Sequence, residues 1–104
     1  MSNFDAHMEH QIIDTFLPFS PKKIILFGSF GSGMDDAESD VDLIIVYDTK
    51  KKFMDRLREL YSSWNIPIAV DILAYTPEEF DLMVKESDFI RQVTTEGEVL
   101  YERA

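Results

Sequence analysis

Five carboxylates crowd into a short stretch that follows several glycines. In LFGSFGSGMDDAESDVDL, residues 26–43, these are Asp35, Asp36, Glu38, Asp40 and Asp42. Like charges about 5 Å apart repel by about 3 kcal/mol at an effective dielectric constant near 20, so the crowding costs stability unless a cation relieves it. The stretch therefore predicts a site that binds cations. Asp35, Asp36 and Glu38 are expected to remain solvated loop acids that add to the local field.

Three aspartates have the spacing of a shared metal site. Asp40 and Asp42 stand two residues apart in DVDLIIVY, which predicts a strand over residues 40–47, so both side chains point to the same face. Asp71 interrupts a second apolar run, IPIAVDILAY, where an unpaired carboxylate is costly. If the two strands are neighbours, the three carboxylates converge.

The chemistry of such a site is that of phosphate esters. Hard oxygen ligands suit Mg²⁺, with Mn²⁺ as the alternative ion. Two ions about 3.5 to 4 Å apart would lower the pKa of an attacking hydroxyl and stabilise a leaving pyrophosphate. We therefore predict that Asp40, Asp42 and Asp71 are both the catalytic and the metal-binding residues.

The glycines before these acids predict a phosphate-binding turn. Gly28, Gly31 and Gly33 permit positive backbone φ and close approach, so successive N–H groups can form an anion-binding nest. The Ser29 hydroxyl is an additional donor. No Gly-Lys-Ser/Thr sequence follows, so this is not a Walker A loop.

The rest of the chain predicts an α/β fold with a small mixed sheet backed by helices. Hydrophobic spacing predicts helices over residues 4–17 and 50–64, and a short helix around residues 89–93 that ends near Gly97. Thr76, Pro77 and Glu79 form a capping-box pattern that starts another helix. Strands are predicted over residues 22–27, 40–47, 66–75 and, at a sheet edge, 98–102.

The order of these motifs resembles the minimal nucleotidyltransferase family of the DNA polymerase beta superfamily. An apolar strand is followed by Gly28-Ser29, ten residues, Asp40-Val41-Asp42 and a third acid in a later strand. The resemblance extends from about Lys22 to Tyr101. It implies that Asp40 and Asp42 bind both metal ions, that Asp71 joins them and assists deprotonation of the acceptor, and that Gly28, Ser29 and Gly33 hold the triphosphate of ATP.

One feature departs from the family pattern. Many relatives carry arginines two and four residues after the first glycine, where this chain has Phe30 and Ser32. Arginine binds phosphate through two parallel hydrogen bonds. Without it, we expect that triphosphate binding is weak or that another group supplies the positive charge. The lysines at residues 22–23 and 50–52 are expected at the wrong ends of their strands, which leaves a partner chain as a source of positive charge.

The resemblance also implies a partner. Family members of this length pair with HEPN proteins, the minimal nucleotidyltransferase acting as antitoxin, in some cases by adenylylating a tyrosine of the toxin. We therefore expect AMP transfer from ATP to a hydroxyl of a HEPN-type toxin within a hetero-oligomer. The alternatives are a non-catalytic antitoxin that covers the toxin's active site and a small-molecule transferase of the aminoglycoside type.

Composition limits the other function classes. A chain of 104 residues has the size of one domain, predicted over residues 1–104. Its net charge of −10 disfavours direct binding of nucleic acid or anionic lipid. The absence of cysteine excludes disulfides and thiolate chemistry. No leader pattern or apolar run long enough for a membrane span is present, which predicts a cytoplasmic protein.

Other conspicuous residues are given structural interpretations. The apolar stripe on the second helix is expected to pack against the core or a partner rather than stack bases; it comprises Phe53, Leu57, Leu60, Tyr61 and Trp64. His7 and His10 have a spacing that can bind metal but are expected to be exposed helix residues. The basic residues of this region are expected to form a solvated helix face, with docking of an acidic partner as the alternative; they are Lys50, Lys51, Lys52, Arg56 and Arg58.

Overall fold

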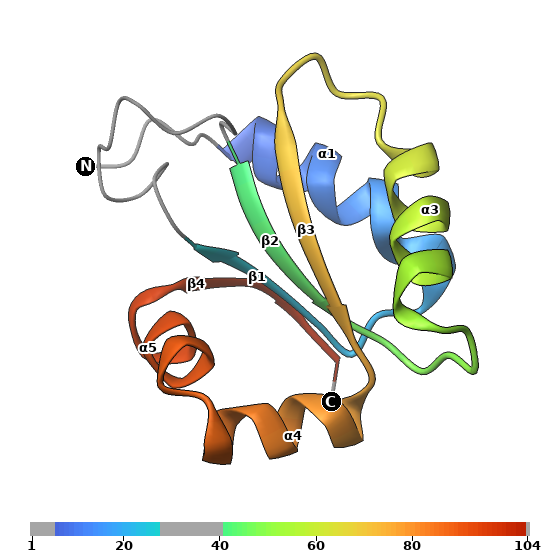
Figure 1. Cartoon of the computed structure of the whole chain (residues 1–104). Coiled ribbons are helices and arrows are strands. Elements are labelled where there is room, and N and C mark those ends of the chain that lie inside the picture. Colours follow the sequence, from blue (N-terminus) through green and yellow to red (C-terminus); the bar gives the residue numbers. More distant parts are fainter. Residues whose placement is uncertain (1–5, 28–40, 104) are drawn as a thin grey trace.

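A computed structural model describes residues 6–27 and 41–103 of the chain as a mixed sheet with helices on both faces (Figure 1). The elements in order are α1 (Ala6–Phe16), the 3-10 helix η1 (Leu17–Phe19), β1 (Lys23–Phe27), β2 (Val41–Val46), α3 (Phe53–Ser63), β3 (Val70–Tyr75), α4 (Pro77–Glu86), α5 (Asp88–Glu96) and β4 (Glu98–Glu102). The predicted α/β class and the mixed sheet are confirmed.

The sheet has the strand order β3-β2-β1-β4. β1 runs antiparallel to both β2 and β4, whereas β2 and β3 are parallel. A parallel pair needs a long crossover connection, and α3 supplies it between β2 and β3. β4 lies at one edge, as the sequence predicted.

Alternation along the strands divides the core into two layers. Val41, Leu43 and Ile45 of β2 point to the face covered by α1 and α3. Ile44 and Val46 point to the opposite face, where they pack with residues of α4 and α5. Asp42 stands at an even-numbered position of β2 and therefore belongs to the face of α4 and α5.

The ends of the last two helices follow from local sequence signals. Thr76 caps α4 by accepting from the Glu79 N–H, and the Glu79 carboxylate accepts from the Thr76 N–H, so the predicted capping box is confirmed. After α5 the chain turns at Gly97, where a β-carbon would stand 2.6 Å from the Val93 carbonyl oxygen and 2.8 Å from that of Leu26. Only glycine fits between these backbone atoms without a shift.

Two predicted elements begin three or more residues later in the structure than expected. The second predicted helix begins at Phe53 rather than Lys50. The third predicted strand begins at Val70 rather than Ile66, because residues 66–68 bend. The Ile68 N–H donates to the Ile66 carbonyl, and the Trp64 indole N–H donates to the Ile68 carbonyl at 2.9 Å.

The later start of β3 changes the environment of Asp71. This residue is the second of the strand and is exposed to solvent. The prediction that Asp71 carries a burial cost inside an apolar strand was therefore wrong.

Candidate functional site

Asp42 and Asp71 are direct neighbours on two parallel strands. Each is the second residue of its strand, and the register pairs Asp42 with Asp71. Adjacent strands are about 4.8 Å apart, and residues paired in a parallel ladder point to the same face. Asp42 is partly buried and Asp71 is exposed. The structure thus brings together two of the three predicted carboxylates.

The remaining predicted site residues lie outside the described part of the chain. These are Asp40, Gly28, Ser29 and Gly33, together with Phe30 and Ser32, the positions that depart from the family pattern. Among residues 6–27 and 41–103, no group of three or more His, Cys, Asp or Glu side chains could hold a metal ion. The described part of the site therefore contributes a pair of carboxylates.

An aromatic pair lies next to these carboxylates. Phe27, the last residue of β1, is paired with Asp42 in the antiparallel register. Phe27, Asp42 and Asp71 therefore form a row across three neighbouring strands. The Phe27 ring packs edge to face with the Phe89 ring of α5, at 6.0 Å between centroids and 80° between planes. Phe89 is nevertheless 55% exposed.

The exposed ring of Phe89 was missed as a candidate site residue. The sequence placed it in the short helix predicted around residues 89–93, with no functional role. Ile90 and Val93 are buried, whereas Phe89 is exposed although it precedes Val93 by four residues and so shares its side of α5. Its spacing alone predicts a packed residue, so no local signal in the sequence marks Phe89 as a site residue.

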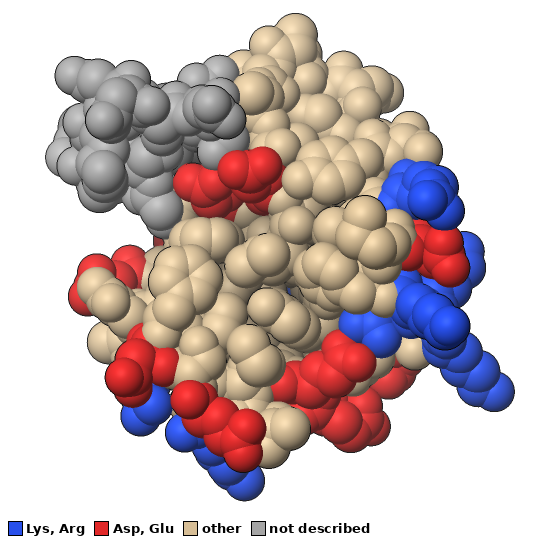
Figure 2. All heavy atoms as spheres, viewed as in Figure 1, with Lys and Arg blue, Asp and Glu red and all other residues tan. Residues whose placement is uncertain are grey.

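The lysines lie at the opposite end of the sheet from the carboxylates, as expected. The register pairs Lys23 with Val46 and Phe27 with Asp42, so Lys23 and Asp42 mark opposite ends of the β1–β2 ladder. In Figure 2 an acidic patch lies where β2 and β3 begin and basic side chains gather at the right along α3, while further side chains of both signs lie along the lower edge. The lysines at residues 50–52 follow the far end of β2.

Arg56 does not belong to a solvated helix face, contrary to the prediction. It is only 7% exposed. Its guanidinium donates to both carboxylate oxygens of Glu79, at 2.6 and 3.1 Å, and its Nε donates to the Lys51 carbonyl at 2.7 Å. The hydrogen bonds from Arg56 lower the pKa of Glu79 below its usual value. Arg56 therefore joins the start of α3 to the start of α4.

Other basic side chains of this region also have local acidic partners. Lys51 contacts Glu59 at 2.7 Å, and Arg58 contacts Asp55 at 2.8 Å. Glu59 also accepts from the Tyr47 hydroxyl, whose pKa is raised mainly by burial. These contacts reduce the positive charge that the region could offer to an acidic partner.

The remaining structural interpretations agree with the structure. His7 and His10 are exposed on α1. In the stripe on α3, Leu60 is buried, whereas Trp64, at the end of the helix, stacks on Phe16. Phe53 and Tyr61 are 38% exposed, so the packing role predicted for the stripe holds for its inner members.

Comparison with known proteins assigns the chain to a family. The family model described as polymerase beta nucleotidyltransferase matches residues 10–104. The chain belongs to the polymerase beta nucleotidyltransferase family. A protein of Methanocaldococcus jannaschii named "Putative protein adenylyltransferase" is 36% identical over 81 residues, which cover 77% of this chain and 78% of the relative. The mixed sheet with its helices is thus a nucleotidyltransferase fold.

The carboxylate pair of this nucleotidyltransferase suits the divalent ions that such enzymes generally use. Two neighbouring carboxylates offer several oxygen ligands from one face of the sheet, and oxygen donors are what Mg²⁺ prefers. The exposure of Asp71 leaves an approach from solvent.

None of the helices in the described ranges is long and apolar enough to span a bilayer.

Proposed function

We propose that this nucleotidyltransferase moves AMP from ATP to a hydroxyl, that of a tyrosine, on a HEPN-type toxin and thereby acts as its antitoxin. The observation that carries the proposal is the register pairing of Asp42 with Asp71 at one end of a nucleotidyltransferase sheet. The name of the relative from Methanocaldococcus jannaschii supports a protein acceptor. The choice of a HEPN toxin rests on the resemblance stated from the sequence.

The proposed reaction assigns a role to each carboxylate. Asp40, Asp42 and Asp71 would hold divalent ions, Mg²⁺ or Mn²⁺, which when bound neutralise phosphate charge and lower the pKa of the acceptor hydroxyl. The acceptor oxygen forms a bond to the α-phosphorus of ATP, and the bond from that phosphorus to the oxygen bridging to the β-phosphate breaks. Pyrophosphate leaves, and the hydroxyl proton passes to the Asp71 carboxylate.

The distribution of charge supports a partner that completes the site. The loop positions that carry arginine in many relatives are Phe30 and Ser32, and the lysines at residues 22–23 and 50–52 lie toward the far end of the sheet. A cation that faces the triphosphate is therefore expected from the acceptor protein. Direct binding of nucleic acid is disfavoured by the net charge of −10.

The proposal is tested by transfer of label from ATP labelled at the α-phosphate. The protein is incubated with Mg²⁺ and the HEPN-type protein encoded next to it, and label on that protein is measured. Asp42→Asn and Asp71→Asn should each reduce the rate by about 100-fold or more, the usual contribution of a catalytic acid–base group. Asp81→Asn, an exposed acid of α4 that changes the net charge equally, should leave the rate within about twofold.

A non-catalytic antitoxin is the second candidate, because the charge of −10 would suit a protein that covers a basic ribonuclease groove. It predicts full neutralisation of the toxin by the Asp42→Asn variant, with no label on any protein. Transfer of label to a free aminoglycoside would instead indicate a small-molecule transferase. Both results would contradict the proposed protein adenylyltransferase.

A further inference from the structure

We propose that the ring of Phe89 is the surface on which the nucleobase of the nucleoside triphosphate stacks. This inference rests on the proposed function and adds to it a residue that binds the base. The observation behind it is the row Phe27, Asp42 and Asp71 across three strands, with Phe89 packed on the first of these side chains.

Position is the first argument. The carboxylates fix where the triphosphate lies, and the base is covalently tied to that triphosphate through its ribose. A surface that holds the base must therefore stand close to Asp42. Phe27 is its direct neighbour across the ladder, and the Phe89 ring lies 6.0 Å from the Phe27 ring.

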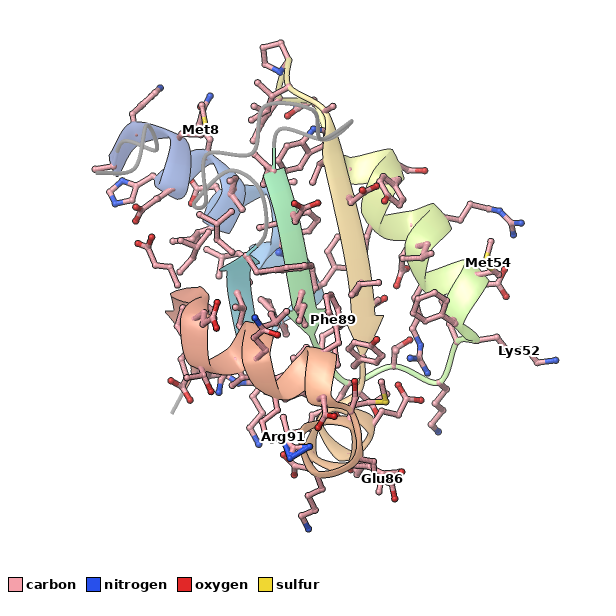
Figure 3. All side chains as sticks on the ribbon, turned by 60° about the vertical axis from the view of Figure 1, so that its left-hand side comes forward. Met8, Lys52, Met54, Glu86, Phe89 and Arg91 are labelled. Atoms are coloured by element: carbon pink, nitrogen blue, oxygen red, sulfur yellow. The ribbon has the colours of Figure 1, made fainter. Side chains whose placement is uncertain are left out.

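Exposure is the second argument. The residues of α5 that support the fold, Ile90 and Val93, are buried, whereas Phe89 is 55% exposed. In Figure 3 Phe89 lies between α5 and the strands, whereas Arg91 lies on the side of the helix away from them. The Phe89 ring contacts Phe27 of the sheet and still reaches solvent, so part of its surface is accessible to a ligand. The edge-to-face contact with Phe27 fixes its orientation.

The other exposed aromatic side chains do not meet both conditions. Tyr61 belongs to α3, which packs mainly on the opposite face of the sheet, and its hydroxyl accepts from the Ile72 N–H in β3, the strand at the edge of the sheet. The centroid of the Phe53 ring lies 6.3 Å from that of Tyr75, the last residue of β3. Phe53 is therefore at the far end of the strand from Asp71. Among the residues that the structure describes, Phe89 is the exposed aromatic ring on the face and at the end of the sheet where the two carboxylates lie.

Stacking would also meet a need that the sequence creates. Phe30 and Ser32 stand where many relatives have arginines, so these two positions offer no guanidinium group to the phosphates. An aromatic platform gains binding energy from the base instead. Every base has a π-face, so stacking does not read the edges of the base. Purines are favoured over pyrimidines only because their larger rings make more contact.

The experiment measures equilibrium binding of Mg²⁺ complexes of ATP and CTP analogues that cannot be cleaved between the α- and β-phosphates, by calorimetry on the full chain. Phe89→Leu keeps an apolar contact for Phe27 but removes the ring, and Phe89→Trp enlarges it. The dissociation constant for the ATP analogue should rise about 5- to 150-fold in Phe89→Leu, the range for loss of one base–aromatic stack. It should stay within about threefold of wild type in Phe89→Trp.

Leu82→Ala is the matched control, because Leu82 of α4 is an equally exposed apolar side chain at 53%. It should leave the dissociation constant within about twofold. A change below about twofold in Phe89→Leu, in protein with wild-type thermal unfolding, would overturn the inference. So would a raised KM for the acceptor protein with unchanged affinity for the nucleotide, because Phe89 would then dock the partner.

Failure of the proposed function gives a different result. If wild-type protein binds the ATP analogue through Phe89 but transfers no label to its partner, the stacking inference stands and the adenylyltransferase proposal falls. If label transfer is normal and Phe89→Leu binds the analogue like wild type, the adenylyltransferase proposal stands and the stacking inference falls. Selective loss of affinity for the purine over the pyrimidine analogue in Phe89→Leu would support the base as the ligand.

Discussion

Replacing Glu79 by Gln should lower the free energy of unfolding, because the buried guanidinium of Arg56 loses its charged partner. Two charge-assisted contacts, of 2.6 and 3.1 Å, join Arg56 to the Glu79 carboxylate across helices α3 and α4. Glutamine can still accept from the Thr76 N–H, so the capping box at the start of α4 is retained. The substitution therefore removes the charge and one good acceptor while keeping the helix cap.

The expected loss follows from the burial of the two partners. A hydrogen bond to a charged group contributes about 1.5 to 3 kcal/mol, and breaking a fully buried ion pair costs about 3 to 5 kcal/mol. The Arg56 side chain is 9% exposed, whereas that of Glu79 is 45% exposed, so water can replace part of what is lost. Arg56 also keeps its bond to the Lys51 carbonyl. We therefore expect the free energy of unfolding to fall by about 2 kcal/mol and Tm by about 10 °C.

Urea unfolding followed by circular dichroism measures this loss, and a double-mutant cycle with Arg56→Met separates the ion pair from other effects. Asp55→Asn is the control, because it removes the exposed pair with Arg58, whose side chains are 56% and 76% exposed. It should cost less than about 0.5 kcal/mol. If Glu79→Gln lowers the free energy of unfolding no more than this control does, and the coupling energy is near zero, then the ion pair of Arg56 does not stabilise the contact between α3 and α4.

Three further predictions concern pH, packing and the site itself. Arg56 and Lys51 lower the pKa values of Glu79 and Glu59 in the folded protein. The contribution of these two carboxylates to the free energy of unfolding is therefore complete above about pH 4.3, the usual pKa of an unfolded glutamate, and is lost as the pH falls through their pKa values in the folded state. In urea titrations the difference in unfolding free energy between wild type and Glu79→Gln should become smaller at that low pH. Gly97→Ala should destabilise by about 1 to 3 kcal/mol in the same assay, since its β-carbon would meet backbone oxygens at 2.6 and 2.8 Å. Asp71→Asn should abolish label transfer yet raise the unfolding free energy by about 0.2 to 1 kcal/mol, because a like-charge cross-strand pair disappears; a loss of stability would contradict this.

Local signals explain how much of the fold the sequence predicted. The capping box at Thr76 and Glu79 and the apolar run of residues 41–46 act within a few residues, so the pattern alone identified them. The start of β3 depends instead on the Trp64 indole, which bonds the Ile68 carbonyl and stabilises a bend in an apolar segment. Propensity alone predicts a longer strand there.

Contacts between residues far apart in sequence explain the errors at the polar positions. A helical pattern assigns an arginine to the solvent side, whereas Arg56 finds Glu79, 23 residues away, in the space between two helices. Likewise, Phe89 is separated by many residues from Phe27, and only the packing of α5 on the sheet brings the rings together. Neither contact leaves a short-range signal in the sequence.

The site was predictable to the extent that it follows from strand geometry. Strand alternation predicted that Asp40 and Asp42 share a face, but the distance between Asp42 and Asp71 depended on which strands are neighbours and in what register. The parallel pairing through α3 sets both residues at the second position of their strands. A shift of one residue would have sent Asp71 to the α1 and α3 face, because side chains alternate.

The register also explains why acids occupy these positions at a cost to the fold. Directly opposed carboxylates repel, and the neighbouring positions of the same strands, Leu43 and Ile72, are buried apolar residues that stabilise the sheet. An apolar pair at positions 42 and 71 would continue that pattern. The chain instead pairs two carboxylates at the end of the sheet, and their repulsion is the cost that the proposed binding of a divalent ion and its nucleotide would offset.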